Sequence, residues 1–187
     1  MLKRRDLLEV PTLFQLLSDP DVFPFVRDKP ENLDAYYFLT KQTIEAENNE
    51  TVISRTILDE FEQPIGTINL YDIQHNYGFL ATWVGKPYFG KGYNKAAKEM
   101  FLNELFLKTS SIEYVFMKIR NSNTRSLKAA LKMPYVAKAN DLFPEIYKQV
   151  NQNGIIYDLF VISKTMYTEY ITFTQQDPGV PNDEEAS

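Results

Sequence analysis

Residues 79–94 read FLATWVGKPYFGKGYN, and this stretch decides the fold. The aromatic and β-branched run 79–84 predicts a strand. Gly85 and Pro87 end that strand, because both residues interrupt a sheet rather than extend it. Beyond them, apolar residues recur at helical spacing over residues 93–107 and predict an amphipathic helix. The stretch is therefore predicted to form a strand, a glycine-rich turn and a helix.

A glycine-rich turn that opens a helix is a ready-made anion site. It presents backbone N–H groups at the positive end of the helix dipole, where phosphate binds. Gly90 and Gly92 have no Cβ that would hold an anion away or forbid the backbone angles of the turn. Lys91 adds positive charge, and Asn94 is expected to cap the helix. The turn therefore predicts a phosphate-binding site.

Other interpretations of this turn compete with one another. Residues 85–91 fit the first seven positions of the nucleotide-binding pattern G-x-x-x-x-G-K-S/T, but Gly92 stands where the magnesium-binding hydroxyl belongs. The dinucleotide pattern G-x-G-x-x-G would need a glycine at Lys95. A tight structural turn with no ligand is the simplest reading of the two glycines. A further motif elsewhere in the chain is needed to decide.

The rest of the chain alternates between helical and extended patterns. Helices are predicted at residues 11–19, 31–47 and 123–132, and strands at 51–58, 65–71, 114–119 and 155–163. This order predicts an α+β (α/β layered) fold with helices on a central sheet. Residues 1–174 are expected to form a single domain. Residues 175–187 have too little apolar content to fold and are expected to be a disordered acidic tail.

Composition excludes several classes of function. Four of the 25 acidic residues lie in the last eleven positions, so the remainder is nearly neutral and lacks the excess of basic residues typical of nucleic-acid binding. No apolar run approaches the roughly 18 residues of a membrane helix, and no signal peptide is evident, so we expect a cytoplasmic protein that binds no membrane. With no cysteine and only His75, we expect no thiol nucleophile and no metal site. His75 itself lies in a polar run, residues 72–76, that predicts a turn between strands.

The strand, turn and helix resemble the acyl-CoA pyrophosphate loop of the GNAT acetyltransferase superfamily, whose core reads Q/R-x-x-G-x-G/A. Gly90 and Gly92 match this core, whereas Pro87 occupies its first position. The wider run 83–93, WVGKPYFGKGY, is similar to the branch that acetylates the N-termini of ribosomal proteins.

A second segment supports the same resemblance. Residues 123–126, NTRS, are similar to the family's N-x-x-S helix start, and residues 133–135, MPY, to the glycine-aromatic pair after that helix. Met133-Pro134 replaces the usual Leu-Gly. The two segments lie about thirty residues apart, as the family pattern implies, and together they extend the resemblance over roughly residues 51–163.

The resemblance implies a mixed, mostly antiparallel central sheet flanked by helices. It also implies acetyl-CoA as the acyl donor and an amine as the acceptor, either a protein or peptide N-terminus or a small molecule; a homodimer is compatible with it. The residues implied in donor binding are Trp83, Val84, Phe89, Gly90, Lys91, Gly92, Tyr93, Asn94, Asn123 and Ser126. Two of them are implied in catalysis: the backbone N–H of Val84 would polarise the thioester carbonyl, and Ser126 would protonate the departing sulfur.

The family's usual general base, a glutamate on the strand before the turn, is replaced here by Phe79. Asp72, His75 or Glu113 could act instead through water, or the amine could enter in its neutral form from solution. Two functions therefore remain open: a working N-acetyltransferase, and an acyl-CoA-binding or regulatory protein that has kept the cradle without the chemistry.

The acceptor pocket of such folds is formed partly by the variable N-terminal helices. Four aromatic residues of this region either line that pocket or belong to the core, and aromatic residues at such spacing are more often core: Phe23, Phe25, Tyr36 and Tyr37.

Overall fold

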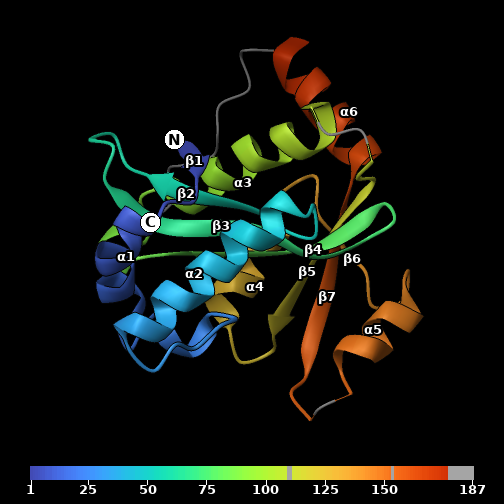
Figure 1. Cartoon of the computed structure of the whole chain (residues 1–187). Helices are drawn as coiled ribbons and strands as arrows, with labels where there is room; N and C mark the ends of the chain where they lie inside the picture. Colours follow the sequence, from blue (N-terminus) through green and yellow to red (C-terminus); the bar gives the residue numbers. More distant parts are fainter. Residues whose placement is uncertain (109–110, 153, 177–187) are drawn as a thin grey trace. The chain divides into compact units, whose positions relative to one another are not determined.

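The computed structural model describes residues 1–108, 111–152 and 154–176 (Figure 1). The chain divides into two compact units, Met1–Lys118 and Ile119–Ser187. The predicted acidic tail lies outside the described residues, except for positions 175 and 176, which end the last helix. No helix in the described ranges is long and apolar enough to cross a membrane.

The first unit is built on a mixed sheet. Its strands are β1 (Leu2–Arg4), β2 (Ile53–Leu58), β3 (Pro64–Gln74), β4 (Tyr77–Val84) and β5 (Tyr114–Arg120), whose last two residues fall in the second unit. The strands lie in the order β1-β2-β3-β4-β5; the first three pairs are antiparallel and β4 pairs with β5 in parallel. The predicted mixed, mostly antiparallel sheet is therefore confirmed.

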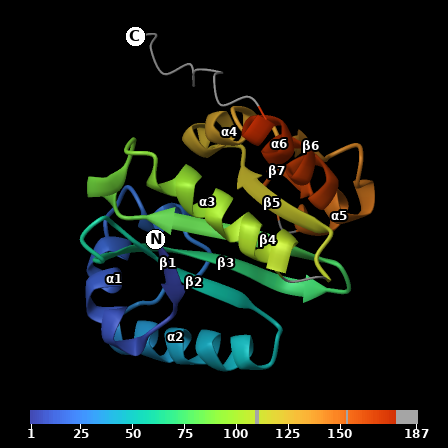
Figure 2. The same ribbon diagram turned by 90° about the horizontal axis from the view of Figure 1, so that it is seen from above.

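Helices cover both faces of this sheet. Figure 2 shows α1 (Val10–Leu17) and α2 (Leu33–Asn48) on one face and α3 (Tyr93–Asn103) on the other. Short 3-10 turns lie at η1 (Leu7–Glu9), η2 (Phe23–Phe25) and η3 (Lys86–Tyr88). The predicted helix 93–107 differs in detail, because its last turn is a π-helix, η4 (Glu104–Lys108).

Apolar side chains of the first 36 residues form the core on the α1 and α2 face. Val10, Leu13 and Leu17 of α1 are almost completely buried, together with Tyr36 of α2. Their spacing of three and four residues places the α1 side chains on one face of the helix. An isolated helix of this length is marginal in water, so packing of this face stabilises α1.

The second unit contains α4 (Thr124–Leu131), β6 (Ala137–Lys138), α5 (Pro144–Val150), β7 (Tyr157–Ser163) and α6 (Lys164–Gln176). β6 and β7 pair antiparallel. Tyr167 of α6 packs edge-on against the fully buried ring of Tyr135, with centroids 5.1 Å apart. The expectation that strand 155–163 ends the fold was wrong: α6 follows it, and its aromatic side chains are held by this contact.

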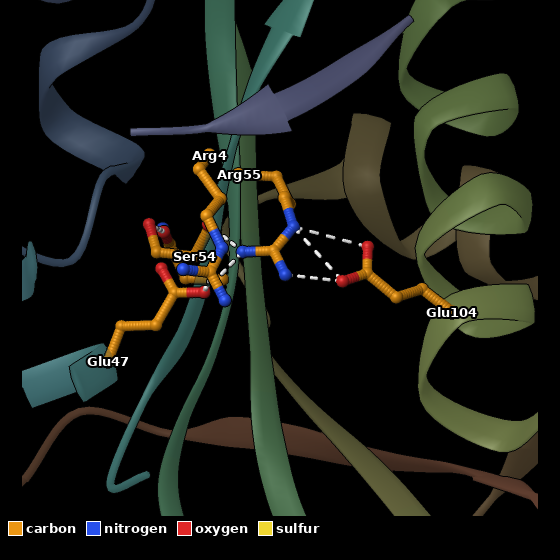
Figure 3. Close-up of polar contacts among 6 residues, drawn as sticks. Arg4, Glu47, Ser54, Arg55 and Glu104 are labelled. Atoms are coloured by element: carbon orange, nitrogen blue, oxygen red, sulfur yellow. Dashed lines mark hydrogen bonds and ion pairs between the residues drawn. The ribbon is translucent and has the colours of Figure 1, made fainter. Parts of the chain in front are cut away.

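Arg55 of β2 links two helices on opposite faces of the sheet (Figure 3). Its guanidinium forms ion pairs with Glu47 of α2 and with Glu104 of the π-helical turn, and its Nε lies 3.1 Å from Glu104 Oε1. Burial lowers the pKa of Arg55, but the hydrogen bonds that its guanidinium donates to Glu104 and Glu47, with the charges of these carboxylates, outweigh that effect and raise the pKa overall. The arginine is only 8% exposed, so removing it would break both ion pairs and leave Glu47 with the longer contact to Arg4, at 3.9 Å.

Candidate active site

The edge of β4 that faces away from β3 is open near its carboxyl end. The Gly85 N–H donates to the carbonyl oxygen of Ile65 at 2.8 Å, and Val84 pairs with Gly66. Because backbone groups alternate in direction along an antiparallel pair, the N–H of Val84 points away from β3.

Strand β5 does not close that edge. Pairing of β4 with β5 covers only Tyr77–Phe79 against Tyr114–Phe116, although both strands continue. Within the described part of the first unit, residues 80–84 therefore have no strand partner on this side. Beyond Phe79 and Phe116 the two strands are no longer paired, which leaves the Val84 N–H on an open edge.

The open edge leads directly into the glycine turn. Gly90 and Gly92 have φ angles of 74° and 80°, in the left-handed region that favours glycine, and a Cβ built on either would meet no atom within 4 Å. Gly92 is the N-cap of α3 and no side chain caps the helix there. The first N–H groups of α3 therefore have no acceptor within the helix and remain available to an anion.

Asn94 does not cap α3 as expected. The helix begins at Tyr93, so Asn94 already lies inside its first turn, and its Nδ2 is 3.4 Å from the Thr82 hydroxyl of β4. The prediction of a cap was wrong because the helix start lies two residues earlier than that role requires. The side chain instead lies between the helix start and the open strand.

Aromatic residues surround the turn. Tyr93 donates a hydrogen bond to Glu60 of the β2–β3 hairpin, and its ring packs edge-on against Tyr88 with centroids 5.7 Å apart. The hydrogen bond to Glu60 raises the pKa of Tyr93 to about 12 and lowers the pKa of Glu60. Trp83, before Gly85, and Phe89, before Gly90, both pack against the core of the first unit. These contacts fix the position of the turn on the sheet.

Asn123 and Ser126 lie in the second unit, at the start of α4. The Asn123 side chain accepts a hydrogen bond from the Ser126 backbone N–H at 3.2 Å and so caps α4. The Ser126 hydroxyl takes no part in that cap and is half-buried. Its proposed chemical role stays a prediction.

The position expected for a general base holds no ionisable group. Phe79 is 7% exposed and packs among Tyr71, Tyr77 and Phe116, with ring centroids 6.0, 6.3 and 5.9 Å away. These contacts explain its presence as core packing.

The alternative bases lie at the other end of β4. His75 lies in the β3–β4 turn, as predicted, and Asp72 is also in this hairpin; both have φ angles of 50°. Glu113 donates its backbone N–H to the carbonyl of Asn76, beside the same turn. At about 3.3 Å per strand residue, this end is roughly 23 Å from Val84, too far for transfer through one water.

A cavity of about 80 Å³ lies between α2 and the sheet of the first unit. It is lined by Arg5, Leu17, Arg27, Asp28, Tyr36, Leu39, Thr40, Thr43, Val52, Thr67, Asn69, Ala81 and Trp83. Ala81 and Trp83 belong to β4, so the cavity adjoins the strand whose free edge was described above.

The aromatic residues expected around an acceptor pocket have divided roles. Tyr36 lines the cavity, Phe23 and Tyr37 pack against the core, and Phe25 is 46% exposed. Sequence reasoning missed Arg5, which is remote from every motif. Thr40 interrupts the apolar stripe formed by Leu33, Tyr36, Tyr37 and Ile44 in the sequence of α2, and this signal could have pointed to a polar cavity.

Comparison with solved structures shows the same fold in known acetyltransferases. A chimera of the spermidine N-acetyltransferase SpeG from Vibrio cholerae and hSSAT aligns with a TM-score of 0.68 at 14% identity, over 90% of this chain and 97% of its own. A GNAT-family acetyltransferase from Bacillus anthracis aligns with 0.68 at 14% identity, over 88% and 94%. The microcin C7 self-immunity acetyltransferase MccE, in complex with acetyl-CoA and AMP, aligns with 0.67 at 18% identity, over 87% and 89%.

No curated protein sequence matches the chain. The family model for the acetyltransferase (GNAT) domain does match it, over residues 2–135. That range covers the whole mixed sheet of the first unit, the glycine turn and α4. The chain therefore belongs to the GNAT acetyltransferase domain family.

Proposed function

We propose that this protein transfers an acetyl group from acetyl-CoA to a primary amine. One observation carries the proposal: the open edge of β4 ends at Val84 and runs into a left-handed glycine turn that opens α3. A strand edge with free N–H groups suits the amide-bearing pantetheine arm, and a helix start suits a pyrophosphate.

The residues of the turn fit the phosphate end of the donor. The backbone N–H groups from Gly90 to Asn94 and the ammonium of Lys91 supply positive potential, and the missing Cβ atoms leave the approach open. Trp83, Phe89 and Tyr93 would pack around the donor, and Asn123 would contact its pantetheine arm. The resemblance to the family carries this last assignment.

For the chemistry, we assign the backbone N–H of Val84 to the thioester carbonyl. An amide held in a sheet needs no reorganisation when negative charge develops on the carbonyl oxygen, which is the condition for effective stabilisation. The Ser126 hydroxyl would protonate the departing thiolate. Both roles rest on the family resemblance.

The burial of Phe79 has a consequence for the acceptor. With Phe79 at the expected base position and Asp72, His75 and Glu113 remote from Val84, we take the neutral amine to come from solution. A peptide α-amine, with an ordinary pKa of about 7.7 to 8.0, is substantially neutral near pH 7.5, whereas a lysine-like amine near 10.4 is almost fully charged. We therefore favour a peptide N-terminus over an alkyl amine. That choice agrees with the similarity to the ribosomal-protein branch.

The phenylalanine at position 79 also supports one competing function, that of an acyl-CoA-binding or regulatory protein without turnover. Phe79 fills the base position with a packed aromatic ring, as a protein that no longer catalyses could tolerate. The two functions differ in turnover and agree in donor binding.

The test has two steps. A ligand that binds only the folded state at a hundredfold excess over its Kd stabilises it by about 2.7 kcal/mol, so acetyl-CoA should raise the melting temperature and Mg-ATP should not. Release of free thiol from acetyl-CoA is then followed with a panel of peptides and small amines. A larger thermal shift with Mg-ATP would refute the proposal, and donor binding without thiol release for any amine would favour the regulatory function.

A further inference from the structure

The cavity beside β4 has an unusually polar wall for the space between a helix and a sheet. Thr40 of α2 is 1% exposed and Thr67 of β3 is 2% exposed, and Asn69 lies next to them on β3. Arg5, which follows β1, completes this side. Such an interface is ordinarily filled with apolar side chains, so this set of polar groups needs an explanation.

Arg5 is poorly paired. Its Nη2 lies 3.5 Å from the Tyr36 hydroxyl and 3.3 Å from the Thr40 hydroxyl, both long for hydrogen bonds from a cation. Its Nε is buried and has no hydrogen-bond partner among the described residues. No carboxylate in the described ranges forms an ion pair with it, whereas Arg55 in the same unit is held by two.

The hydroxyls around Arg5 are also donors without acceptors. Tyr36 and Thr40 accept from Arg5 and donate to no described residue, and Thr67 accepts only a long contact from Asn69 at 3.4 Å. Burial raises the pKa of Tyr36, although Arg5 opposes this effect, so its phenol keeps its proton at neutral pH. The cavity wall therefore offers hydrogen-bond donors and positive charge.

Two carboxylates act on this wall: Asp28 and Glu9 both raise the pKa of Tyr36, in the opposite sense to Arg5. Glu9 is paired with Lys3 at 2.8 Å. Asp28 is the one acid among the described lining residues, against two arginines, and it lies 3.8 Å from the Nε of Arg27. The Arg27 guanidinium also stacks over the Tyr71 ring at 4.1 Å. Both members of the pair are about half exposed, so water screens them, whereas Arg5 lies deeper in the wall.

We infer that this cavity binds a carboxylate of the acetyl acceptor, with Arg5 as its main partner. The inference rests on the proposed function and adds the class of acceptor: an amine-bearing molecule with a carboxylate a few bonds from the amine, such as an acidic peptide N-terminus. A volume of about 80 Å³ suits a small anionic group and not a whole ligand, since cavities of roughly 150 Å³ are filled by one benzene. A polycation such as a polyamine would meet two arginines and is disfavoured.

Matched acceptors test the charge alone. Ala-Glu and Ala-Gln peptides with amidated C-termini have the same shape and the same α-amine, and differ only in the carboxylate. A charged hydrogen bond to Arg5 predicts that the Glu peptide has a kcat/KM about tenfold or more above the Gln peptide. β-Alanine against β-alaninamide repeats the comparison for a small molecule, and aminoethyl phosphate against ethanolamine tests a phosphate instead. Spermidine is the cationic comparison.

The variant Arg5→Gln assigns the effect to this residue. It should remove the preference, so that kcat/KM for the Glu peptide falls to the value for the Gln peptide in the same variant. Arg4→Gln is the matched control, because Arg4 is the neighbouring residue, is largely exposed, and lies 3.9 Å from Glu47 away from the cavity. Arg5→Lys replaces Arg5→Gln if the latter does not fold, and should keep the preference in weakened form.

A binding measurement separates failure of this inference from failure of the proposed function. With CoA present, the N-acetylated Glu peptide should raise the melting temperature of the wild type more than the N-acetylated Gln peptide, and Arg5→Gln should abolish the difference. If acetyl-CoA binds but the Gln peptide, the phosphate compound or spermidine is the better acceptor, the carboxylate assignment is wrong. If the Glu preference survives in Arg5→Gln, the site lies elsewhere. Absence of donor binding would refute the proposed function itself, and the thermal-shift comparison would still decide the cavity's anion preference.

Discussion

Gly66 of β3 lies so close to Trp83 of β4 that a Cβ built on it would overlap the Trp83 carbonyl oxygen and come within 2.8 Å of the Val84 Cα. The nearest neighbours of this added Cβ are all backbone atoms, so no side-chain rotation could relieve the contact. A Gly66→Ala variant must therefore move β4 at the point where we place the thioester carbonyl. We expect a loss of stability of about 1–3 kcal/mol and weaker acetyl-CoA binding, measured by denaturation and calorimetry.

Gly78→Ala is the control for this prediction. Its Cβ would also come within 2.8 Å of a neighbour, but that neighbour is the side chain of Leu70, which can rotate. It should lose some stability and bind acetyl-CoA normally. Equal losses of affinity in the two variants would show that donor binding does not depend on the position of Val84.

A second prediction concerns the glycine turn. Gly92→Val should weaken acetyl-CoA binding strongly, because the new side chain stands at the helix start where the pyrophosphate is proposed to lie. Gly154→Val is the matched control, since Gly154 also has a left-handed φ, 77°, and open space around its Cα. Both changes cost roughly 1–2 kcal/mol of backbone strain. Normal CoA affinity in folded Gly92→Val would move the phosphate site elsewhere.

Ser126 and Asn123 can be separated by mutation. Because Asn123 provides the cap of α4, Asn123→Ala should cost about 1 kcal/mol of stability. Ser126→Ala should leave the melting temperature nearly unchanged and lower kcat by about a hundredfold, more than it weakens CoA binding, as expected for a proton donor that acts in the transition state. Melting temperature, Kd and kcat are measured on the same preparation, with an acceptor already identified. An unaltered kcat would remove Ser126 from the mechanism.

The Tyr93–Glu60 hydrogen bond predicts a pH dependence. The pKa of Tyr93 is raised, so its share of stability is present below pH 10 and is lost as pH rises from 10 through about 12. The pKa of Glu60 is lowered from 4.5, so its share is present above 4.5 and is lost as pH falls through the lowered value. Tyrosinate absorbance should contain a component near pH 12 that is lost in Tyr93→Phe and returns toward 10 in Glu60→Gln, whereas the raised titration of Tyr36 should persist in both variants. Titration of Tyr93 at its ordinary pKa in the wild type would show that the hydrogen bond does not form in solution.

Most of the elements between residues 51 and 132 could be predicted because their patterns are local. β1 could not, since three residues, Leu2–Arg4, carry no periodicity and become a strand only by pairing with β2, from which they are separated by some fifty residues. α6 was missed for another reason. Its sequence is rich in threonine and tyrosine, which have low helix propensity, and burial of Tyr167 against Tyr135 overrides that preference.

The candidate site likewise has one part that the sequence predicts and one part that it does not. The glycine turn could be predicted from the sequence, because glycine adopts the left-handed backbone angles of positions 90 and 92 far more readily than other residues. The residue type alone therefore indicates the conformation. The cavity of the first unit could not be predicted. It joins Thr40 of α2, Thr67 of β3 and Arg5, which lies between β1 and η1, and no short-range sequence pattern relates them. The distant position of Asp72, His75 and Glu113 likewise follows from strand length and not from any local motif.

The register of β4 gives its two substrates different kinds of recognition. Its outward N–H groups would hold the acetyl donor through the main chain, while Ala81 and Trp83 turn their side chains toward the acceptor cavity. Main-chain groups survive most substitutions, whereas side chains change with each one. Point mutations of these side chains could therefore change the acceptor while donor binding by the main chain stays the same. This is one physical route by which proteins of a single fold come to acetylate many different amines.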